Sequence, residues 1–315
     1  MTKELLGLVC IRTGMLCMKG DAPKTFTGLD GQQEQHSWMP IVEGEPYFLQ
    51  NVGSTAAATG RTDDGKFDKT HLSPEKAWRI GRDYLAHCIR YGFPMKVIKE
   101  HVGAGGRILE MGCGKEIPLF RTLTCDHSAV KYYKPSVYVG ADLNTIQYRP
   151  RITGCETTIL PKTDITSEEG AAKVPDVPFD VVVSFEVLEH MDKPDGHRFL
   201  DAMFAFARRK AEREGEDGLI ILSTPVNGGK IAKNHIYEWQ QSELRRAFEK
   251  RGGVIEGEYG TFSNLRDLAA AMDDTETEVW NRLARYHSPH TLSCIFSAMH
   301  PDAARNIAWK VRVPA

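Results

Sequence analysis

Apolar residues in the middle of the chain occur in short continuous runs, each followed by a turn and often by a helical pattern. Because these runs show no alternation of apolar and polar positions, they are typical of strands covered on both faces of a parallel sheet. Such runs lie at Arg107–Met111, Val137–Ala141, Thr157–Leu160, Phe179–Phe185 and Leu219–Ser223. Strands that alternate with helices predict a Rossmann-like, doubly wound α/β fold with a ligand crevice at the carboxyl ends of the strands.

Two further strands complete a mostly parallel sheet of seven. They are expected at Val254–Tyr259 and Asn306–Val313, with a helical insertion at about 263–300 between them. One helix carries an apolar stripe that includes Phe199 and Met203, and a second helix is expected over Gln240–Arg251.

Residues 1–72 differ from the rest, because short β-like pieces lie there among Gly, Asp and Gln. The small and polar stretch Gly53–Lys66 is typical of a loop or linker. We therefore expect an N-terminal extension, a cap or lid, over 1–72 and one α/β domain over 73–315. The first helix of that domain is expected to begin with Ser73 as its N-cap and to end at Gly92 and Pro94.

Composition indicates an ordinary globular protein of 315 residues with a net charge of −2. A charge this close to zero argues mildly against tight, non-specific binding to nucleic acid. The seven scattered cysteines form no CxxC pair and favour reduced thiols in the cytoplasm. No apolar run approaches the roughly 20 residues that cross a bilayer, so no membrane partner is expected. The oligomeric state stays open.

The strongest local motif is ILEMGCGKE, in which an apolar strand ends at Glu110 and is followed by Gly112 and Gly114. Glycines allow backbone N–H groups to approach a ligand, and the carboxylate can accept hydrogen bonds from a ligand amine. The third glycine of a dinucleotide-binding GxGxxG loop is missing, and Glu116 would repel a phosphate. The motif therefore favours a cationic cofactor without phosphate, although a plain structural turn is the alternative.

Two more acids follow the next strands. Asp142 ends the second strand, where an open α/β nucleotide site has its ribose-binding carboxylate. Asp164 follows the third strand, where it can meet an adenine amino group or cap a short helix at Ile165–Glu169. Both interpretations of Asp164 stay open.

Together with FDVVVSFEVLEHM at the fourth strand, these motifs resemble the class I S-adenosylmethionine-dependent methyltransferases over roughly residues 75–262. The resemblance implies S-adenosylmethionine as cofactor, with its methionine part near Glu110, its ribose on Asp142 and its adenine beside Asp164. The full set of implied cofactor-binding residues is Glu110, Gly112, Cys113, Gly114, Asp142, Leu143, Asp164, Ile165 and Phe185.

The reaction end of the site is expected after the fourth strand, where Glu186, Glu189 and His190 share one face of a helical turn. His235 and Glu238 follow the fifth strand and can reach the same end of the ligand crevice. In one interpretation these side chains only organise the site, and in another His190 or His235 is a general base.

A third interpretation comes from a second resemblance. The pattern ExxEH followed by HxxEW is similar to the metal-assisted small-RNA 3′-terminal 2′-O-methyltransferases. It implies that Glu186, Glu189, His190 and His235 are catalytic and hold a divalent metal such as Mg, Mn or Co.

The acceptor is less well defined. The segments NHIYEWQQSELRRAF, EYGTFSNLRDL and ARNIAWKV resemble methyltransferases of bacteriophages and some bacteria, which favours nucleic-acid or nucleotide modification at an O or N nucleophile. Trp239 can stack on a base, although packing is the commoner role of such a residue. A basic rim or a solvated helix face can be formed by Lys230, Lys233, Arg245, Arg246, Lys250 and Arg251.

The base-methylation motifs Asn/Asp-Pro-Pro-aromatic and Pro-Cys are absent from the sequence, which disfavours those two mechanisms. The alternatives to the nucleic-acid or nucleotide acceptor are a small-metabolite methyltransferase, a non-catalytic protein that binds S-adenosylmethionine, and a nicotinamide oxidoreductase.

Overall fold

The chain divides into two compact units, Met1–Tyr84 and Leu85–Ala315, in a computed structural model. It describes residues 90–103, 105–124, 133–147, 154–226, 228, 231–232 and 234–315, and five short strands before residue 43. These strands are β1 (Leu5–Cys10), β2 (Leu16–Met18), β3 (Phe26–Thr27), β4 (Gln33–Glu34) and β5 (Trp38–Val42). They form a three-stranded sheet in the order β2-β1-β5 and a β3-β4 pair. The helix expected from Ser73 and the loop Gly53–Lys66 lie outside the described residues, and the boundary at residue 72 stays a prediction.

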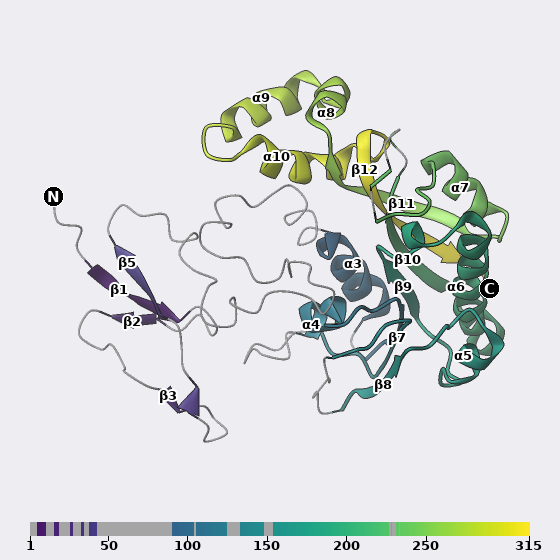
Figure 1. The fold of residues 1–315 in the computed structure, drawn as a ribbon. Helices are drawn as coiled ribbons and strands as arrows, with labels where there is room; N and C mark the ends of the chain where they lie inside the picture. The colour runs from purple at the N-terminus through teal and green to yellow at the C-terminus, as the bar shows by residue number, and fades with distance from the viewer. Residues whose placement is uncertain are drawn as a thin grey trace. The chain divides into compact units, whose positions relative to one another are not determined.

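The second unit is built on a seven-stranded sheet in the order β11-β12-β10-β9-β6-β7-β8 (Figure 1). Its strands are β6 (Arg107–Met111), β7 (Val137–Asp142), β8 (Glu156–Pro161), β9 (Val181–Phe185), β10 (Gly218–Pro225), β11 (Val254–Ser263) and β12 (Ala304–Val313). Only β12 runs antiparallel to its neighbours, β10 and β11, among the seven. The predicted Rossmann-like, mostly parallel sheet of seven strands is confirmed.

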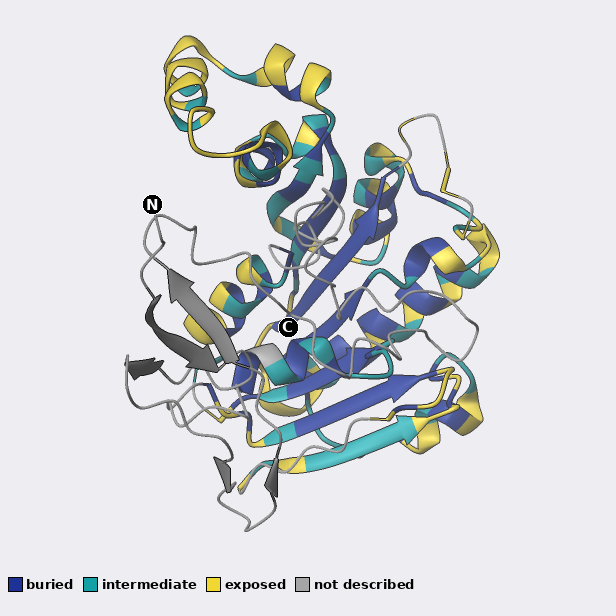
Figure 2. Ribbon diagram, turned by 60° about the vertical axis from the view of Figure 1, so that its left-hand side comes forward, coloured by how far each residue is buried: buried dark blue, intermediate teal, exposed yellow. Residues whose placement is uncertain are grey.

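Helices cover both faces of this sheet, which explains why its strands are apolar without alternation. Val182 on β9 packs in the cluster formed with α6 (Lys193–Glu214) and α7 (Gln241–Glu249). Its neighbours Val181 and Val183 pack on the other side, with α3 (Gly92–Val97) and α4 (Pro118–Thr124). Figure 2 shows the central strands buried along their length.

Helix ends follow local signals. Asp192 caps α6 by accepting a hydrogen bond from Asp195 N at 2.8 Å, and Gly215 ends that helix with φ 67°. A helical segment ends at Arg90, just before Gly92 and Pro94, as expected. Gly92 and Pro94 then lie in the first turn of the next helix, α3, which continues as a π-helical turn at Ile98–Val102. A proline in a first turn loses no hydrogen bond, because the N–H groups there have no partner inside the helix.

The strand order changes direction beside β6, with β7 and β8 on one side and β9 and β10 on the other. The loops that leave β6 and β9 therefore diverge at their carboxyl ends and open a crevice there, which is the usual ligand position in an open α/β sheet.

The predicted helical insertion consists of α8 (Leu265–Ala271), α9 (Asp274–Leu283) and α10 (Pro289–Phe296), and residues 264–303 are called the helical arm below. The arm joins β11 to β12. Because β12 pairs with β10 in antiparallel register, Asn306 opposite Pro225, the arm leaves the sheet at the same edge as the crevice. Among the described residues, no helix combines the length and apolarity that a membrane span requires.

Candidate active site

A cavity of about 480 Å³ lies at the carboxyl ends of β6, β7 and β9. Its size falls within the range of small-molecule and cofactor sites, about 300–1,000 Å³. All nine residues implied as cofactor-binding line it: Glu110, Gly112, Cys113, Gly114, Asp142, Leu143, Asp164, Ile165 and Phe185. Glu186 and His190 line it as well.

The turn after β6 forms one wall of the cavity and depends on its glycines. Gly112 and Gly114 have φ of 81° and 72°, a conformation that costs other residues about 1–2 kcal/mol. A Cβ on Gly112 would also lie 2.2 Å from Cγ2 of Val187, so this position has no room for a side chain. Gly112 N and Cys113 N donate hydrogen bonds to Ala141 O at 2.8 and 3.1 Å, which fastens the turn to β7.

Glu110 is buried beneath this turn and accepts a hydrogen bond from the hydroxyl of Tyr138. Burial, followed by the negative charge of Asp142, raises the pKa of Glu110 to about 8. No cation among the described residues forms an ion pair with this carboxyl group, although it lines the cavity. A ligand ammonium would fit beside Glu110, because its positive charge would pair with the carboxylate and favour the charged form of that group.

The Asp142 carboxylate is held in a fixed orientation at the end of β7. Oδ2 accepts a hydrogen bond from Gly114 N at 2.8 Å, and Oδ1 accepts from Asn144 N at 2.7 Å. Oδ1 also accepts from Asn144 Nδ2 at 3.1 Å. Because each carboxylate oxygen has two acceptor positions, Oδ1 is fully used and Oδ2 keeps one position for a hydroxyl of a sugar.

Asp164 lies beside the exposed Leu143 in the cavity wall, and its carboxylate accepts from Thr166 N and Oγ1 at 3.0 and 2.7 Å. The alternative in which Asp164 caps a helix at Ile165–Glu169 is wrong, because the helix there is α5 (Glu168–Ala172), capped by Ser167.

Glu186 follows β9 with φ 56°, a left-handed conformation that is rare for a residue with a side chain. Its carboxylate accepts hydrogen bonds from Ser223 Oγ at 2.7 Å and Asn306 Nδ2 at 2.8 Å. Nη1 of the buried Arg90 pairs with it at 3.3 Å. These donors on β10, β12 and the segment before α3 hold Glu186, and the structure does not place it in the group formed by the other three predicted metal ligands.

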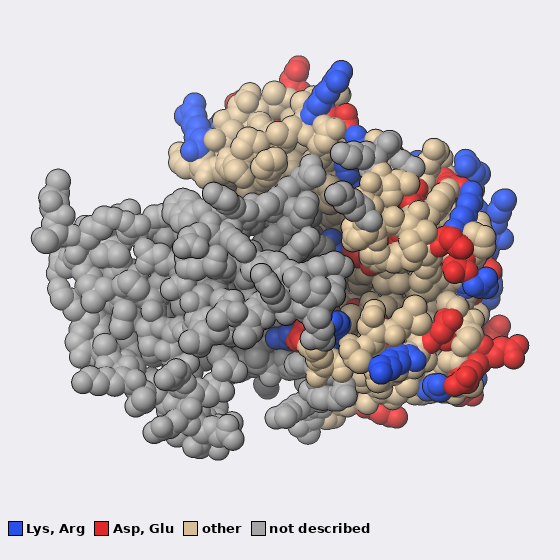
Figure 3. Space-filling model, viewed as in Figure 1, with Lys and Arg blue, Asp and Glu red and all other residues tan. Residues whose placement is uncertain are grey.

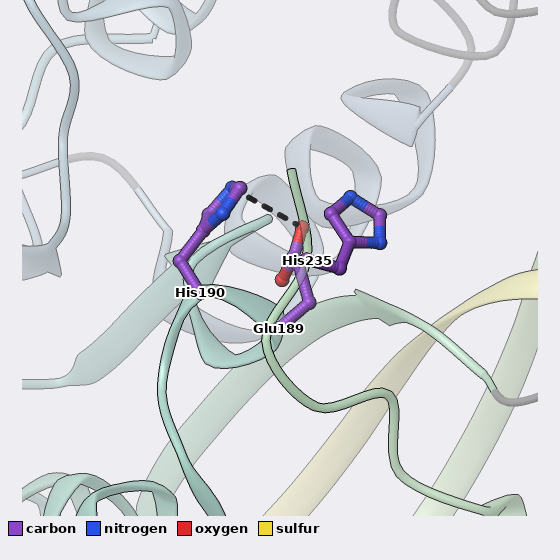
Figure 4. Close-up of side chains that lie close together, drawn as sticks. All are labelled: Glu189, His190 and His235. Carbon is purple, nitrogen blue, oxygen red and sulfur yellow. Dashed lines mark ion pairs between the residues drawn. The ribbon is translucent and has the colours of Figure 1, made fainter. Parts of the chain in front are cut away.

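Glu189, His190 and His235 do come together. One ligand atom from each lies within 4.8 Å of the others, and Figure 4 shows the Glu189 carboxylate between the two imidazole rings. Burial, followed by the negative charge of Glu186, raises the pKa of Glu189 to about 8. Glu189 O accepts a hydrogen bond from Ile236 N at 2.8 Å, which brings the distant His235 segment to this position.

Both imidazoles are oriented by an acceptor at Nδ1. His190 Nδ1 lies 2.9 Å from Asn234 O, and His235 Nδ1 lies 2.6 Å from Oε1 of the buried Glu238. Because a carbonyl and a carboxylate only accept hydrogen bonds, each Nδ1 carries the proton and each Nε2 keeps a free lone pair. This is the usual arrangement around metal-binding histidines, in which an outer acceptor fixes the ring.

Other partners of the site had no local signal in the sequence. Arg90 lies outside the motifs, Asn306 lies in the segment ARNIAWKV but far along the chain from the predicted site residues, and Tyr138 is one of several apolar positions on its strand. Trp239 is fully buried and packs against His197 and Tyr237, so it does not offer a stacking surface.

Two of the four described members of the predicted basic rim are neutralised, whereas Arg246 and Lys250 are exposed and have no ion pair among the described residues. Arg245 pairs with Glu258 and Asp302, and Arg251 pairs with Asp201 at 2.8 Å. Lys230 and Lys233 lie outside the described residues.

Solved structures to which the chain is similar include the small RNA methyltransferase HEN1 (14% identity, 75% of this chain and 26% of that chain, TM-score 0.46). They also include magnesium protoporphyrin IX methyltransferase from Synechocystis PCC 6803 (11% identity, 84% and 100%, TM-score 0.44). A third is the mycolic acid cyclopropane synthase CmaA1 (13% identity, 78% and 87%, TM-score 0.39). The chain thus spans about a quarter of the length of HEN1.

No curated protein matches the chain. A family model described as a methyltransferase domain matches residues 90–282, more than half of the sequence. These residues include β6 to β11, the glycine turn and the Glu189–His190–His235 group. The chain belongs to this family and is a class I S-adenosylmethionine-dependent methyltransferase.

Proposed function

We propose that the enzyme transfers the methyl group to a ribose hydroxyl of a nucleic acid or nucleotide, assisted by a divalent metal at Glu189, His190 and His235. One observation carries this proposal: the Glu189 carboxylate and two imidazoles, each held at Nδ1, converge in one group, and His190 of this group lines the cavity. A purely structural role would not require both rings to be held with the lone pair free.

The chemistry explains why a hydroxyl acceptor is favoured. S-adenosylmethionine supplies an activated methyl group, so a neutral amine needs little assistance, whereas a sugar hydroxyl is a poor nucleophile. A divalent metal held by Glu189, His190 and His235 would supply Lewis-acid chemistry that lowers the pKa of a ribose hydroxyl. Glu110 and Asp142 orient the cofactor, and fixed orientation of two reactants can supply about 7–11 kcal/mol of a barrier.

The donor set also narrows the choice of metal. Carboxylate oxygens suit Mg²⁺ and Mn²⁺, whereas imidazoles suit Zn²⁺, Fe²⁺ and Co²⁺ more closely. With two imidazoles and one carboxylate, Glu189, His190 and His235 favour Mn²⁺ or a borderline ion over Mg²⁺. Glu238 and Asn234 O would orient the rings in either case.

A second function uses the same residues without a metal. His190 lines the cavity, and its Nε2 lies 4.0 Å from Oε1 of Glu189. An imidazole in this position can accept the proton of an acceptor hydroxyl or amine as a general base. This alternative predicts activity in a chelator and permits a small-metabolite acceptor.

The test combines direct metal binding with a defined set of acceptors. Co²⁺ is titrated into the protein and its visible absorption is recorded for the wild type, for His235→Ala and for the control His101→Ala. His101 is an exposed residue that contacts Lys310. We expect the wild type and the control to bind Co²⁺ and His235→Ala to bind it at least 100-fold more weakly.

Labelled cofactor is then incubated with oligonucleotides that end in ribose, 2′-deoxyribose or 3′-deoxyribose, and with a metabolite pool. We expect methylation of the ribose end, lost in a chelator and restored by Mn²⁺ or Co²⁺. Full activity of metal-free enzyme would reject the metal, and labelling of the metabolite pool alone would reject the acceptor.

A further inference from the structure

The helical arm contains a long segment without acidic residues. Between Val279 and Pro301 the sequence has no Asp or Glu, but it has two arginines and several histidines. The turn from α9 to α10 carries most of these basic residues. We call it the arm turn and define it as Arg282, Arg285, Tyr286, His287 and His290, all of which are exposed.

The positive charge of the arm turn is not neutralised. Arg282 has one weak partner, Glu278, at 3.9 Å, and both side chains are about three-quarters exposed. A pair of this kind contributes little, about 0–1 kcal/mol. No ion pair is found for Arg285, His287 or His290 within the described part of the chain. Figure 3 shows Lys and Arg atoms at the outer end of the arm, where α9 meets α10.

An exposed aromatic ring accompanies these cations. Tyr286 is 80% exposed, which is unusual for a large ring in a folded chain. The arm does not need Tyr286 for its own stability, because its core is formed elsewhere. Trp280 packs on Phe296 at 5.2 Å between ring centroids, and Leu268 and Leu292 are fully buried beside them. Cations that alternate with an exposed aromatic ring are typical of surfaces that bind single-stranded nucleic acid, where phosphates pair with the cations and a base stacks on the ring.

The arm is also fastened to the reacting end of the site. Asn306, at the start of β12, donates a hydrogen bond from Nδ2 to Glu186 at 2.8 Å. His300 Nε2 lies 2.9 Å from Glu276, which ties α9 to the turn that leads into β12. The helical arm therefore leaves the sheet at the same edge as Glu189 and His190. A polymer whose end lies at those two residues can extend along the arm.

We infer that the arm turn binds the phosphates and one base of a single-stranded nucleic acid whose terminal ribose is the methyl acceptor. The inference rests on the proposed function and extends it, because a polymer of several nucleotides, and not a mononucleotide, becomes the acceptor. Arg282 and Arg285 bind phosphates, and Tyr286 stacks on a base.

The test measures binding and methylation separately. Fluorescence anisotropy with a labelled single-stranded RNA 12-mer is recorded from low to moderate salt for Arg282→Ala/Arg285→Ala and for Tyr286→Ala. The control Lys173→Ala/Arg198→Ala removes the same charge from exposed positions on α5 and α6.

We expect the double arginine variant to bind at least tenfold more weakly, and the slope of log K against log salt to fall by about 1.4 for two lost phosphate contacts. Tyr286→Ala weakens binding about tenfold at every salt concentration, because stacking is not ionic. The control binds like the wild type. Affinity for S-adenosylhomocysteine is unchanged in all variants, whereas KM for the 12-mer rises in the arm variants.

Wild-type affinity of both arm variants for the 12-mer would overturn the inference, and so would self-association through the arm without binding of the 12-mer. The proposed function fails by a different result, in which the 12-mer binds through the arm but no ribose oxygen is methylated with any metal. Because binding needs neither metal nor methyl transfer, the two failures are distinguishable.

Discussion

The two ends of the cavity are built in different ways. At the end proposed to bind the cofactor, Glu110 and Asp142 lie on β6 and β7 and Gly112 follows β6, and the hydrogen bonds that fix them join these neighbouring strands. At the proposed acceptor end, Glu189 and His190 meet His235 from a distant loop, which hydrogen bonds from Ile236 N and Tyr237 N to Glu189 O hold there. The cofactor end therefore depends on the geometry of the sheet, whereas the acceptor end depends on the docking of a loop. Substitutions are therefore expected to affect the two ends independently.

The largest effect is expected for Gly112→Ala, which places a Cβ against Val187 and strains the backbone. Binding of S-adenosylhomocysteine, measured by calorimetric titration, should weaken more than 100-fold. Gly114→Ala is the matched control, because its Cβ would make only an ordinary contact with Pro118 Cδ at 3.9 Å, so that the conformational cost of about 1–2 kcal/mol applies alone. Equal, small losses for both variants would show that the turn after β6 does not hold the cofactor.

Glu238→Gln should affect the acceptor end alone. Its carboxylate fixes the His235 ring, and loss of such an outer partner typically lowers metal affinity about 10–100-fold. Titration with Co²⁺ should show this loss, while the affinity for S-adenosylhomocysteine stays at the wild-type value. A parallel loss of cofactor affinity would contradict the independence of the two ends.

Asp142→Asn should affect the cofactor end alone, and by less than Gly112→Ala. The amide keeps the size of the side chain but loses the charge, so hydrogen bonds to a sugar weaken by about 2 kcal/mol, or roughly 30-fold. Calorimetry with S-adenosylhomocysteine measures this change, and Co²⁺ titration serves as the control. Unchanged cofactor affinity would remove Asp142 from the ribose site.

The smallest effect concerns pH and Glu110, whose pKa is about 8 without ligand. A ligand ammonium favours the carboxylate, so binding below pH 8 releases a proton, and affinity for S-adenosylhomocysteine should rise about fivefold from pH 6.5 to 8. Glu110→Gln should remove this slope, and 5′-methylthioadenosine, which lacks the ammonium, should show none. A slope that survives in Glu110→Gln would assign the proton to another group.

The raised pKa of Glu110 also predicts how the stability of the ligand-free protein depends on pH. Between about pH 4.5 and 8 the folded state keeps the proton of Glu110, while the unfolded state loses it. The free energy of unfolding therefore falls as pH rises through this window.

Much of the fold was predictable, because a buried strand can be recognised from the apolar run of its own residues. Arg107–Met111 was predicted to the residue, since an apolar run between two polar turns has no competing interpretation. Gly92 and Pro94 mark a boundary between two helices, because the residues that end one helix also suit the first turn of the next. Trp239 was ambiguous for a similar reason, because an aromatic residue at helical spacing is compatible with both packing and stacking until its burial is known.

The sequence alone determined the sheet, the glycine turn and the two acids of the cofactor end, because each depends on residues within one strand and the turn that follows it. Only the tertiary structure decided which acidic and histidine side chains meet at the acceptor end. Glu186 and Glu189 are near neighbours in the sequence, yet donors on β10 and β12 hold the first while His235 joins the second. Contacts between segments so far apart depend on loop docking, which no local pattern encodes.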